Sequence, residues 1–328
     1  MAGSLRNVDV GDLVERTRAG DIRAVARLIT LVENDSPVLR EVAAALSPHS
    51  GRAQVIGLTG APGVGKSTAT SALVTTLRAA GSRVGVLAVD PSSPFSGGAL
   101  LGDRVRMQDH ATDDGVFIRS MASRGQLGGL SAAVPQALRV LDAAGYDIVL
   151  VETVGVGQVE VEIASLADTT LLVVAPGFGD GIQAAKAGII EIADVFVVNK
   201  ADRDGADQVA RDLRFMQSLG GPHSTAGAWR PPIVKTIAAR NEGIDDVVAA
   251  IGKHREWMQG HGEVARRRRA RAASEIEAIA MGEVRLRFAG VHGSAALDAE
   301  AAQVVAGTTD PYSAAADLLN LLRSRSGA

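Results

Sequence analysis

The feature that most constrains this chain is a glycine-rich stretch, residues 60–67, that fits the phosphate-binding P-loop pattern. A strand-like segment, Gln54–Thr59, precedes it and a helical pattern follows it, which a glycine-rich turn without function would not explain. Its glycines allow backbone conformations that a Cβ would obstruct, so successive N–H groups can point at phosphate oxygens. We therefore predict nucleotide binding by Gly60, Ala61, Pro62, Gly63, Val64, Gly65, Lys66, Ser67 and Thr68.

The last two residues of the motif have distinct predicted roles. The ammonium of Lys66 is expected to reach the β- and γ-phosphates and to take part in catalysis. The hydroxyl of Ser67 is expected to coordinate Mg²⁺.

The hydrophobic pattern changes twice along the chain and predicts three regions. Residues 1–50 carry apolar side chains at helical spacing, which predicts a helical N-terminal extension. In residues 51–252 short apolar strands alternate with helices, which is typical of an α/β P-loop NTPase domain with a mostly parallel, doubly wound sheet. Residues 253–328 form a helical C-terminal arm. The expected strands after the first lie at 84–89, 116–118, 148–151, 170–174, 195–198 and 233–237.

Composition excludes some classes of partner. The 328 residues are 46% hydrophobic and carry a formal net charge of -3, which gives no reason to expect nucleic acid or an acidic membrane as partner. A basic run, residues 266–269 with Arg271, has acidic neighbours and is interpreted as a solvated helix face or a dimer seam, the alternative being a nucleic-acid site. No apolar run is long enough to span a membrane, no signal peptide is apparent and there is no cysteine, so we expect a cytoplasmic protein.

A second motif, Asn-Lys-x-Asp at residues 199–202, follows a buried-type strand and predicts the base. The carboxylate of Asp202 can accept hydrogen bonds from N1–H and the exocyclic amine of guanine, whereas adenine offers no matching pair of donors. Lys200 can lie along the purine face, and Asn199 can tie this loop to the P-loop. The alternative for this motif alone is a polar turn at the end of a strand. After the last strand, the amide of Ala238 is placed to meet the guanine O6.

Acidic residues near the strand ends are candidate magnesium ligands. Glu152, in Glu-Thr-Val-Gly, takes the place of the aspartate in the Asp-x-x-Gly element of GTPases and is expected to hold Mg²⁺ through water, while the Gly155 amide senses the γ-phosphate. Asp90 and Asp103 can also lie near the metal. The alternative for Asp103 is a loop aspartate beside neighbouring arginines.

The position after Gly155 bears on the rate of hydrolysis. Many small GTPases have a water-positioning glutamine there, whereas this chain has Val156, with Gln158 two residues later. We therefore predict slow intrinsic hydrolysis that a partner accelerates.

These motifs together resemble those of the methylmalonyl-CoA mutase-associated GTPases, called MeaB or ArgK in bacteria and MMAA in humans, within the G3E class. The Glu-Thr-Val-Gly-Val-Gly-Gln string, joined to Asp-Pro-Ser-Ser-Pro, is specific to that family among P-loop proteins. One departure is Ile237, where relatives often have Ser before the alanine. The resemblance rests on residues 60–67, 89–94, 102–104, 151–158, 179–186 and 199–202.

The resemblance implies a GTPase core with a helical extension and a dimerising C-terminal arm. Members use GTP to gate delivery of adenosylcobalamin to an acyl-CoA mutase and to protect that mutase, so the implied cofactors are GTP/GDP and Mg²⁺ and the implied partners are the mutase and a second copy. By resemblance Asp103 and Glu152 become magnesium or water-network residues, and Gln158 and Lys186 become coupling residues in switch loops. The predicted catalytic set is Lys66, Asp103, Glu152, Gln158 and Lys186.

Three other functions compete with this reading. An ATP-dependent kinase linked to arginine or ornithine transport is disfavoured by Asp202, which suits guanine. A nickel-insertion GTPase would need the His- or Cys-rich sites that this sequence lacks. A nucleotide-locked scaffold would never hydrolyse GTP.

Overall fold

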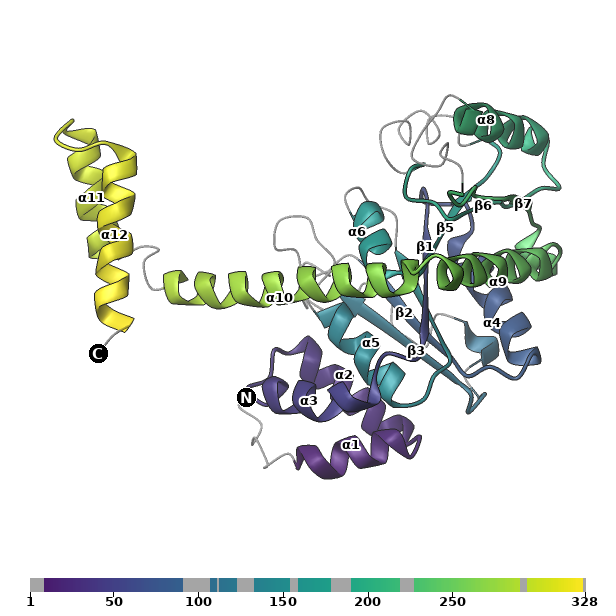
Figure 1. Cartoon of the computed structure of the whole chain (residues 1–328), viewed down its shortest axis with the longest axis horizontal. Helices are drawn as coiled ribbons and strands as arrows, with labels where there is room; N and C mark the ends of the chain where they lie inside the picture. Colours follow the sequence, from purple (N-terminus) through teal and green to yellow (C-terminus); the bar gives the residue numbers. More distant parts are fainter. Residues whose placement is uncertain are drawn as a thin grey trace. The chain divides into compact units, whose positions relative to one another are not determined.

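A single parallel sheet organises the larger part of the chain (Figure 1). The structure is a computed structural model that describes residues 9–90, 107–110, 112–122, 133–153, 159–177, 190–218, 227–289 and 294–326.

The sheet has seven strands in the order β3-β2-β4-β1-β5-β6-β7, and every recorded pairing is parallel. Side chains of the central strands are buried on both faces, which explains why the strands read as continuous apolar runs. All seven predicted strands are confirmed within a few residues: β1 Gln54–Thr59, β2 Val84–Asp90, β3 Val116–Ala122, β4 Ile148–Thr153, β5 Thr169–Val174, β6 Val195–Val198 and β7 Ile233–Lys235.

Helices cover both faces of the sheet, as a doubly wound fold requires. Helices α4 (Lys66–Ala79) and α9 (Ile244–Gly260) pack on one face with the inward side chains of β1, β5 and β6. Helices α5 (Ala133–Ala143), α6 (Val159–Leu166) and α8 (Ala206–Ser218) pack against the other. The carboxyl ends of the strands are thus left for loops that can bind a ligand.

The N-terminal extension consists of α1 (Val10–Arg18), α2 (Ile22–Glu33) and α3 (Leu39–Leu46), which share a core with α5. Asp21 caps α2, accepting from the amide of Arg23 at 2.8 Å. Arg119 of β3 pairs with Glu33 and so ties the extension to the sheet edge.

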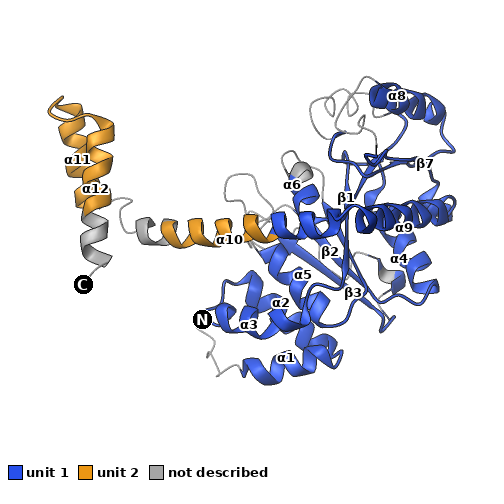
Figure 2. Ribbon diagram, viewed as in Figure 1, with its two compact units in different colours: residues 1–271 blue, residues 272–328 orange. Residues whose placement is uncertain are grey.

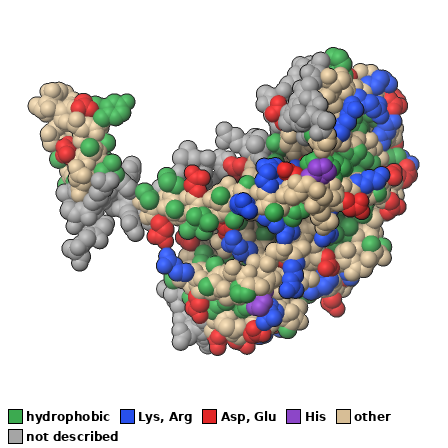
Figure 3. Space-filling model, viewed as in Figure 1, with side chains coloured by type: hydrophobic (Ala, Val, Ile, Leu, Met, Phe, Trp, Pro, Cys, Tyr) green, Lys and Arg blue, Asp and Glu red, His purple; other side chains and the backbone are tan. Residues whose placement is uncertain are grey.

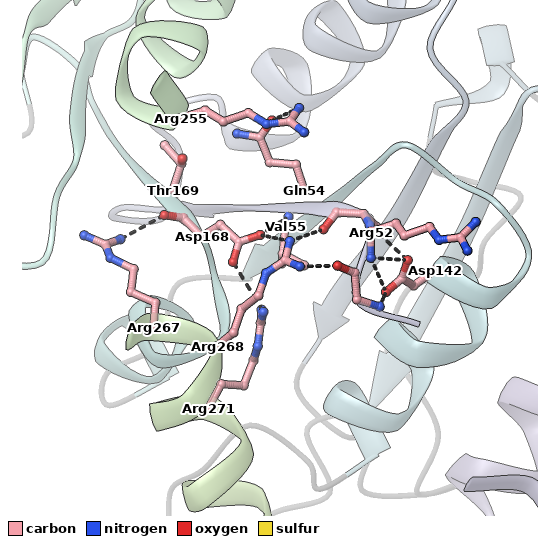
Figure 4. A network of polar contacts seen from close by, with 12 residues as sticks. Arg52, Gln54, Val55, Asp142, Asp168, Thr169, Arg255, Arg267, Arg268 and Arg271 are labelled. Carbon is pink, nitrogen blue, oxygen red and sulfur yellow. Dashed lines mark hydrogen bonds and ion pairs between the residues drawn. The ribbon is translucent and has the colours of Figure 1, made fainter. Parts of the chain in front are cut away.

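At the amino ends of β5 and β6 a group of arginines fastens the first turns of α10 (Glu263–Ala289) to the sheet (Figure 4). Arg267 makes a bidentate contact with Asp194, with both nitrogen–oxygen distances 2.8 Å, and donates to the Asp168 carbonyl at 2.9 Å. Arg268 and Arg271 approach the Asp168 carboxylate at 3.7 and 3.3 Å. We call Arg267, Arg268 and Arg271 the arginine clasp.

The arginine clasp corrects the interpretation of the basic run. Its three guanidiniums are partly buried against two carboxylates that are almost fully buried, so these three arginines do not form a solvated helix face. Arg266 is exposed, as predicted, and pairs with Glu263 one turn earlier. A sequence shows that arginines lie close together but not which strand ends they meet.

The chain divides into two compact units, residues 1–271 and 272–328 (Figure 2). Helix α9 continues to residue 260, so the boundary expected at 252/253 falls inside a helix. The second unit contains the end of α10 and the pair α11 (Ala295–Val305) and α12 (Pro311–Ser326), which pack together. Within the described ranges no helix is both long and apolar enough to cross a membrane.

Candidate nucleotide-binding site

The loop between β1 and α4 has the backbone shape of a phosphate cradle. Gly60 has φ +141°, and a Cβ there would lie 2.1 Å from the carbonyl oxygen of Val173 on the adjacent strand. Gly65 has φ +94° and a Cβ there would lie 2.5 Å from Asn199 Nδ2. Neither position can carry a side chain without displacing its neighbours, and α4 starts directly after Gly65 with no side chain capping it. The N-terminus of a helix presents backbone amides to which an anion can bind.

Lys66 lies over its own loop. Its Nζ donates to the carbonyls of Gly60 at 2.5 Å and Ala61 at 3.0 Å, and the residue is only 7% exposed. A buried ammonium needs acceptors, and the loop carbonyls supply them. The positive charge is therefore held at the loop, where the oxygens of a bound phosphate can take over as acceptors.

Ser67, Thr70 and Glu152 form a cluster of oxygen atoms beside the loop. The Ser67 hydroxyl donates to Glu152 Oε1, and Thr70 Oγ1 lies 3.0 Å from Glu152 Oε2 and 3.0 Å from the Lys66 carbonyl. Strand pairing places Glu152 beside Leu58 of β1 and Ala88 of β2. Hydroxyl and carboxylate oxygens are the ligands that Mg²⁺ prefers, so this cluster suits the ion.

Asp90 is the last residue of β2, which pairs with β4 on the side opposite to β1, and it is fully buried. The strands thus bring Asp90 to the same edge of the sheet as Glu152, as the two predicted metal positions require. Among the described residues no group of three or more His, Asp or Glu side chains is arranged to hold a metal.

Asn199 joins three loops by hydrogen bonds. Its Nδ2 donates to the Val64 carbonyl at 3.0 Å, and its Oδ1 accepts from the Ala238 amide at 3.1 Å and the Thr236 hydroxyl at 3.2 Å. The link to the P-loop that the sequence predicted is present. We call the loops that follow β6 and β7 the base-side loops. Because Asn199 is 3% exposed, these bonds hold the base-side loops in a fixed position relative to the P-loop.

Lys200 is in the left-handed region, with φ +57°, and its Nζ donates to the Gly63 carbonyl at 2.6 Å. Its stem therefore bridges from the end of β6 to the P-loop. The predicted contact of this stem with the purine face stays a prediction.

Asp202 is paired with a cation from a neighbouring loop. Its side chain is 43% exposed, and its Oδ2 lies 3.3 Å from the guanidinium of Arg240. Arg240 ends the 3-10 helix η6 (Ala238–Arg240), which begins with the residue predicted to meet the base. Spacing in the sequence cannot reveal that this loop brings a cation to Asp202.

The remaining predicted residues divide into two groups. Pro62, Gly63 and Thr68 are exposed around the loop, whereas Val64 is buried beneath it. Four others, Asp103, Gly155, Gln158 and Lys186, lie outside the described residues.

The sequence analysis missed three residues of this site, Thr70, Thr236 and Arg240. Thr70 lies one helical turn after Ser67, a spacing that could have indicated a shared face. No signal in the sequence indicated the other two, since their partners are distant along the chain.

Fold and site together define a P-loop nucleotide-binding protein of the GTPase type. The model of the family described as "Methylmalonyl Co-A mutase-associated GTPase MeaB" matches residues 25–292. A predicted GTPase of Pyrococcus abyssi is 48% identical over 93% of this chain and 94% of its own length. The chain belongs to the MeaB family and is a GTPase.

Two further relatives agree with this assignment. GTPase ArgK of Escherichia coli is 38% identical over 75% of this chain and 76% of its own length. A crystal structure described as an LAO/AO transport system kinase superposes with a TM-score of 0.73 at 26% identity, covering 98% of this chain and all of that one. The P-loop α/β fold with terminal helices is thus shared along nearly the whole length.

Proposed function

We propose that this GTPase is a chaperone of an adenosylcobalamin-dependent acyl-CoA mutase, methylmalonyl-CoA mutase or a close relative. GTP binding and hydrolysis gate delivery of the cofactor and protect the mutase from inactivation. The observation that carries the proposal is the match to the mutase-associated family over residues 25–292, which include part of the extension, the nucleotide site and all of α10.

In this proposal, different residues of the site bind the phosphates of GTP and the magnesium ion. Amides of the loop and of the first turn of α4 bind the phosphates, and Lys66 neutralises charge on the β- and γ-phosphates. Ser67 would hold Mg²⁺ directly and Glu152 would hold it through water, and Asp90 and Asp103 are the other proposed magnesium residues. Bound Mg²⁺ would neutralise charge that develops during phosphoryl transfer. The Lys66→Ala variant should lose hydrolysis and bind nucleotide more weakly.

The base is read by Asp202, with Lys200 along the purine face and the Ala238 amide at O6. Changing Asp202 to Asn replaces one acceptor oxygen by a donor, so Asp202→Asn should move preference away from GTP. An unchanged ratio of GTP to ATP affinity in this variant, measured by calorimetry, would remove the base-reading argument.

Hydrolysis without a partner is slow in this proposal, because Val156 occupies the position of the water-positioning glutamine. Gly155, Gln158, Asp103 and Lys186 transmit the nucleotide state to the mutase. A single-turnover rate above about one per second without partner would contradict this, being far above an unassisted GTPase rate.

The client is tested with a purified methylmalonyl-CoA mutase. Complex formation is measured by gel filtration with GDP, GTP and a non-hydrolysable GTP analogue, and hydrolysis is measured with and without mutase. Nucleotide-dependent association and faster hydrolysis are expected, and Lys66→Ala should show neither. The chaperone proposal fails if the mutase does not change the rate of GTP hydrolysis and the GTPase does not slow the mutase's loss of activity during turnover.

A transport-linked kinase is the second candidate, since the similar crystal structure carries that description. The kinase reading requires ATP, and Asp202 at the base-side loop disfavours it. Tighter binding of ATP than of GTP would favour the kinase. A nickel-insertion GTPase is less well supported, because the sequence has no cysteine and the described residues hold no metal-ligand cluster.

We also propose that the C-terminal arm mediates a homodimer. Seven of the nine large hydrophobic residues that are exposed among the described residues lie at or beyond position 276, including Ile276 at 68% and Ile279 at 50%. Figure 3 shows such side chains along α10. Exposed aliphatic groups at this density favour association. The double variant Ile276→Lys/Ile279→Lys should be monomeric by light scattering, whereas a monomeric parent chain would contradict the proposal.

A further inference from the structure

Arg240 and Asp202 face each other across the base-side loops. The distance from Arg240 Nη2 to Asp202 Oδ2 is 3.3 Å, and the two side chains are 57% and 43% exposed. Glu242 Oε1 lies 3.6 Å from the other terminal nitrogen, so the guanidinium is placed between two carboxylates. The contact with Asp202 is an exposed ion pair at the acid proposed to read guanine.

The backbone holds Arg240 in this place. Its amide donates to the Ile237 carbonyl at 2.8 Å, and Ile237 exchanges hydrogen bonds with Glu242 at 3.0 and 3.3 Å. Asn241 takes the left-handed conformation, with φ +59°, which closes the turn. The start of the same turn is fastened to Asn199 through the Ala238 amide. One short loop therefore carries both a proposed base contact and a cation for Asp202.

The backbone around Asp202, on the other side of the ion pair, is also held by hydrogen bonds. The Ala201 amide donates to the Thr236 carbonyl at 3.0 Å and the Arg203 amide donates to the Lys200 carbonyl at 3.0 Å. The carboxylate of Asp202 thus leaves a defined turn beside β7 (Ile233–Lys235). Since both backbones are held, the two side chains meet because of how the loops are built.

We propose that Arg240 sets the base selectivity of this GTPase by competing with the purine for one oxygen of Asp202. The proposal rests on the guanine-reading role of Asp202 given above. Guanine presents two donors, N1–H and the exocyclic amine, and engages both carboxylate oxygens. Hypoxanthine has only N1–H and engages one, so Arg240 keeps the other oxygen. Arg240 therefore weakens the binding of guanine nucleotides more than the binding of hypoxanthine nucleotides. It thereby reduces the ratio of their two dissociation constants.

The size of the effect follows from the exposure of the pair. Exposed ion pairs change an equilibrium by up to about fivefold, and salt screens them. The expected shift in selectivity is accordingly about threefold at low salt and smaller at high salt. Loss of a positive charge near the site also lowers the affinity for the phosphates of every nucleoside diphosphate. That effect is the same for each of them, so it cancels in a ratio of two dissociation constants.

The test compares GDP with inosine 5′-diphosphate by calorimetry, using the full chain and Arg240→Met. Methionine keeps the length of the side chain and removes its charge, and the exposed position tolerates it. The ratio of the inosine to the guanine dissociation constant should rise about threefold in Arg240→Met, and the rise should shrink in 0.5 M salt. Arg211→Met, at an exposed arginine on α8, is the matched control and should leave the ratio unchanged.

A ratio that stays the same or falls in Arg240→Met overturns the proposal. ADP serves to separate this failure from failure of the proposed function. If the parent chain does not bind GDP more tightly than ADP, guanine reading by Asp202 is itself wrong. If it prefers GDP and Arg240→Met leaves the ratio unchanged, only the role of Arg240 is lost.

Discussion

Ser67 donates a hydrogen bond from its hydroxyl to the carboxylate of Glu152 and so joins the first turn of α4 to the end of β4. Glu152 is 1% exposed, and a buried carboxylate needs donors on its oxygens. The hydroxyls of Ser67 and Thr70 are placed to serve them. If Mg²⁺ takes the Ser67 oxygen, as proposed above, the contact of Glu152 with Thr70 would continue to orient the carboxylate.

Thr70→Val is expected to lower hydrolysis about tenfold, because residues that orient metal-bound groups are commonly worth 10-fold to 100-fold. Valine has nearly the same shape as threonine and removes only the hydroxyl. The Mg²⁺ concentration at half-maximal rate should rise, while GDP affinity in a chelator should not change. Thr70→Ser should restore both readouts, and a normal magnesium dependence in Thr70→Val would show that Thr70 does not position Glu152.

Asn199→Ala is expected to destabilise the chain by roughly 2–3 kcal/mol, since it removes three hydrogen bonds and leaves buried partners unsatisfied. GDP affinity should fall at the same time, because the base-side loops lose their link to the P-loop. Urea unfolding and calorimetry measure the two effects. Gln208→Ala, at an exposed polar residue of α8, should change neither, and a wild-type GDP affinity in Asn199→Ala would contradict the coupling.

The sheet could be predicted from the sequence because its strands are buried on both faces and read as apolar runs bounded by turns. The P-loop was equally readable. Gly60 and Gly65 are required by the neighbouring Val173 carbonyl and Asn199 amide, and such local constraints select residue types at fixed spacing.

Contacts between distant segments could not be predicted in this way. Arg240 meets Asp202 only because β7 lies beside β6, and Arg267 meets Asp194 only because α10 crosses the amino ends of the strands. Apolar residues repeat at the period of a helix or strand, whereas a single charged residue has no repeat in the sequence that would identify its partner. The sequence therefore indicated the phosphate and base motifs but not the cations that act on them or the arginine clasp.

Arg267→Ala is expected to lower the free energy of unfolding by about 3–5 kcal/mol, because it leaves the buried carboxylate of Asp194 without its bidentate partner. Arg267→Lys should recover only part of this, since an ammonium cannot make the two parallel bonds. Arg266→Ala, one residue earlier and exposed, should change stability by less than about 0.5 kcal/mol. Equal losses at 266 and 267 in urea unfolding would show that the clasp does not stabilise the fold.

His254 of α9 is fully buried between Thr169 and Asp194. Burial lowers its pKa from 6.5 to about 4, outweighing the attraction of Asp194, whose charge is already paired with Arg267. The folded chain therefore keeps His254 neutral while the unfolded chain binds a proton below about pH 6.5. Stability from this residue is fully present above that pH and is lost as the pH falls towards 4.

The loss amounts to roughly 3 kcal/mol over that range, as the difference between the two pKa values implies. Urea unfolding at pH 7, 6, 5 and 4.5 should show a steeper fall for the parent chain than for His254→Asn, in which an amide can replace the contact of Nδ1 with Thr169. His261→Asn, at the exposed histidine that follows the last residue of α9, is the control and should follow the parent curve. Parallel curves for the parent chain and His254→Asn would mean that His254 takes up a proton in the folded state, against the burial argument.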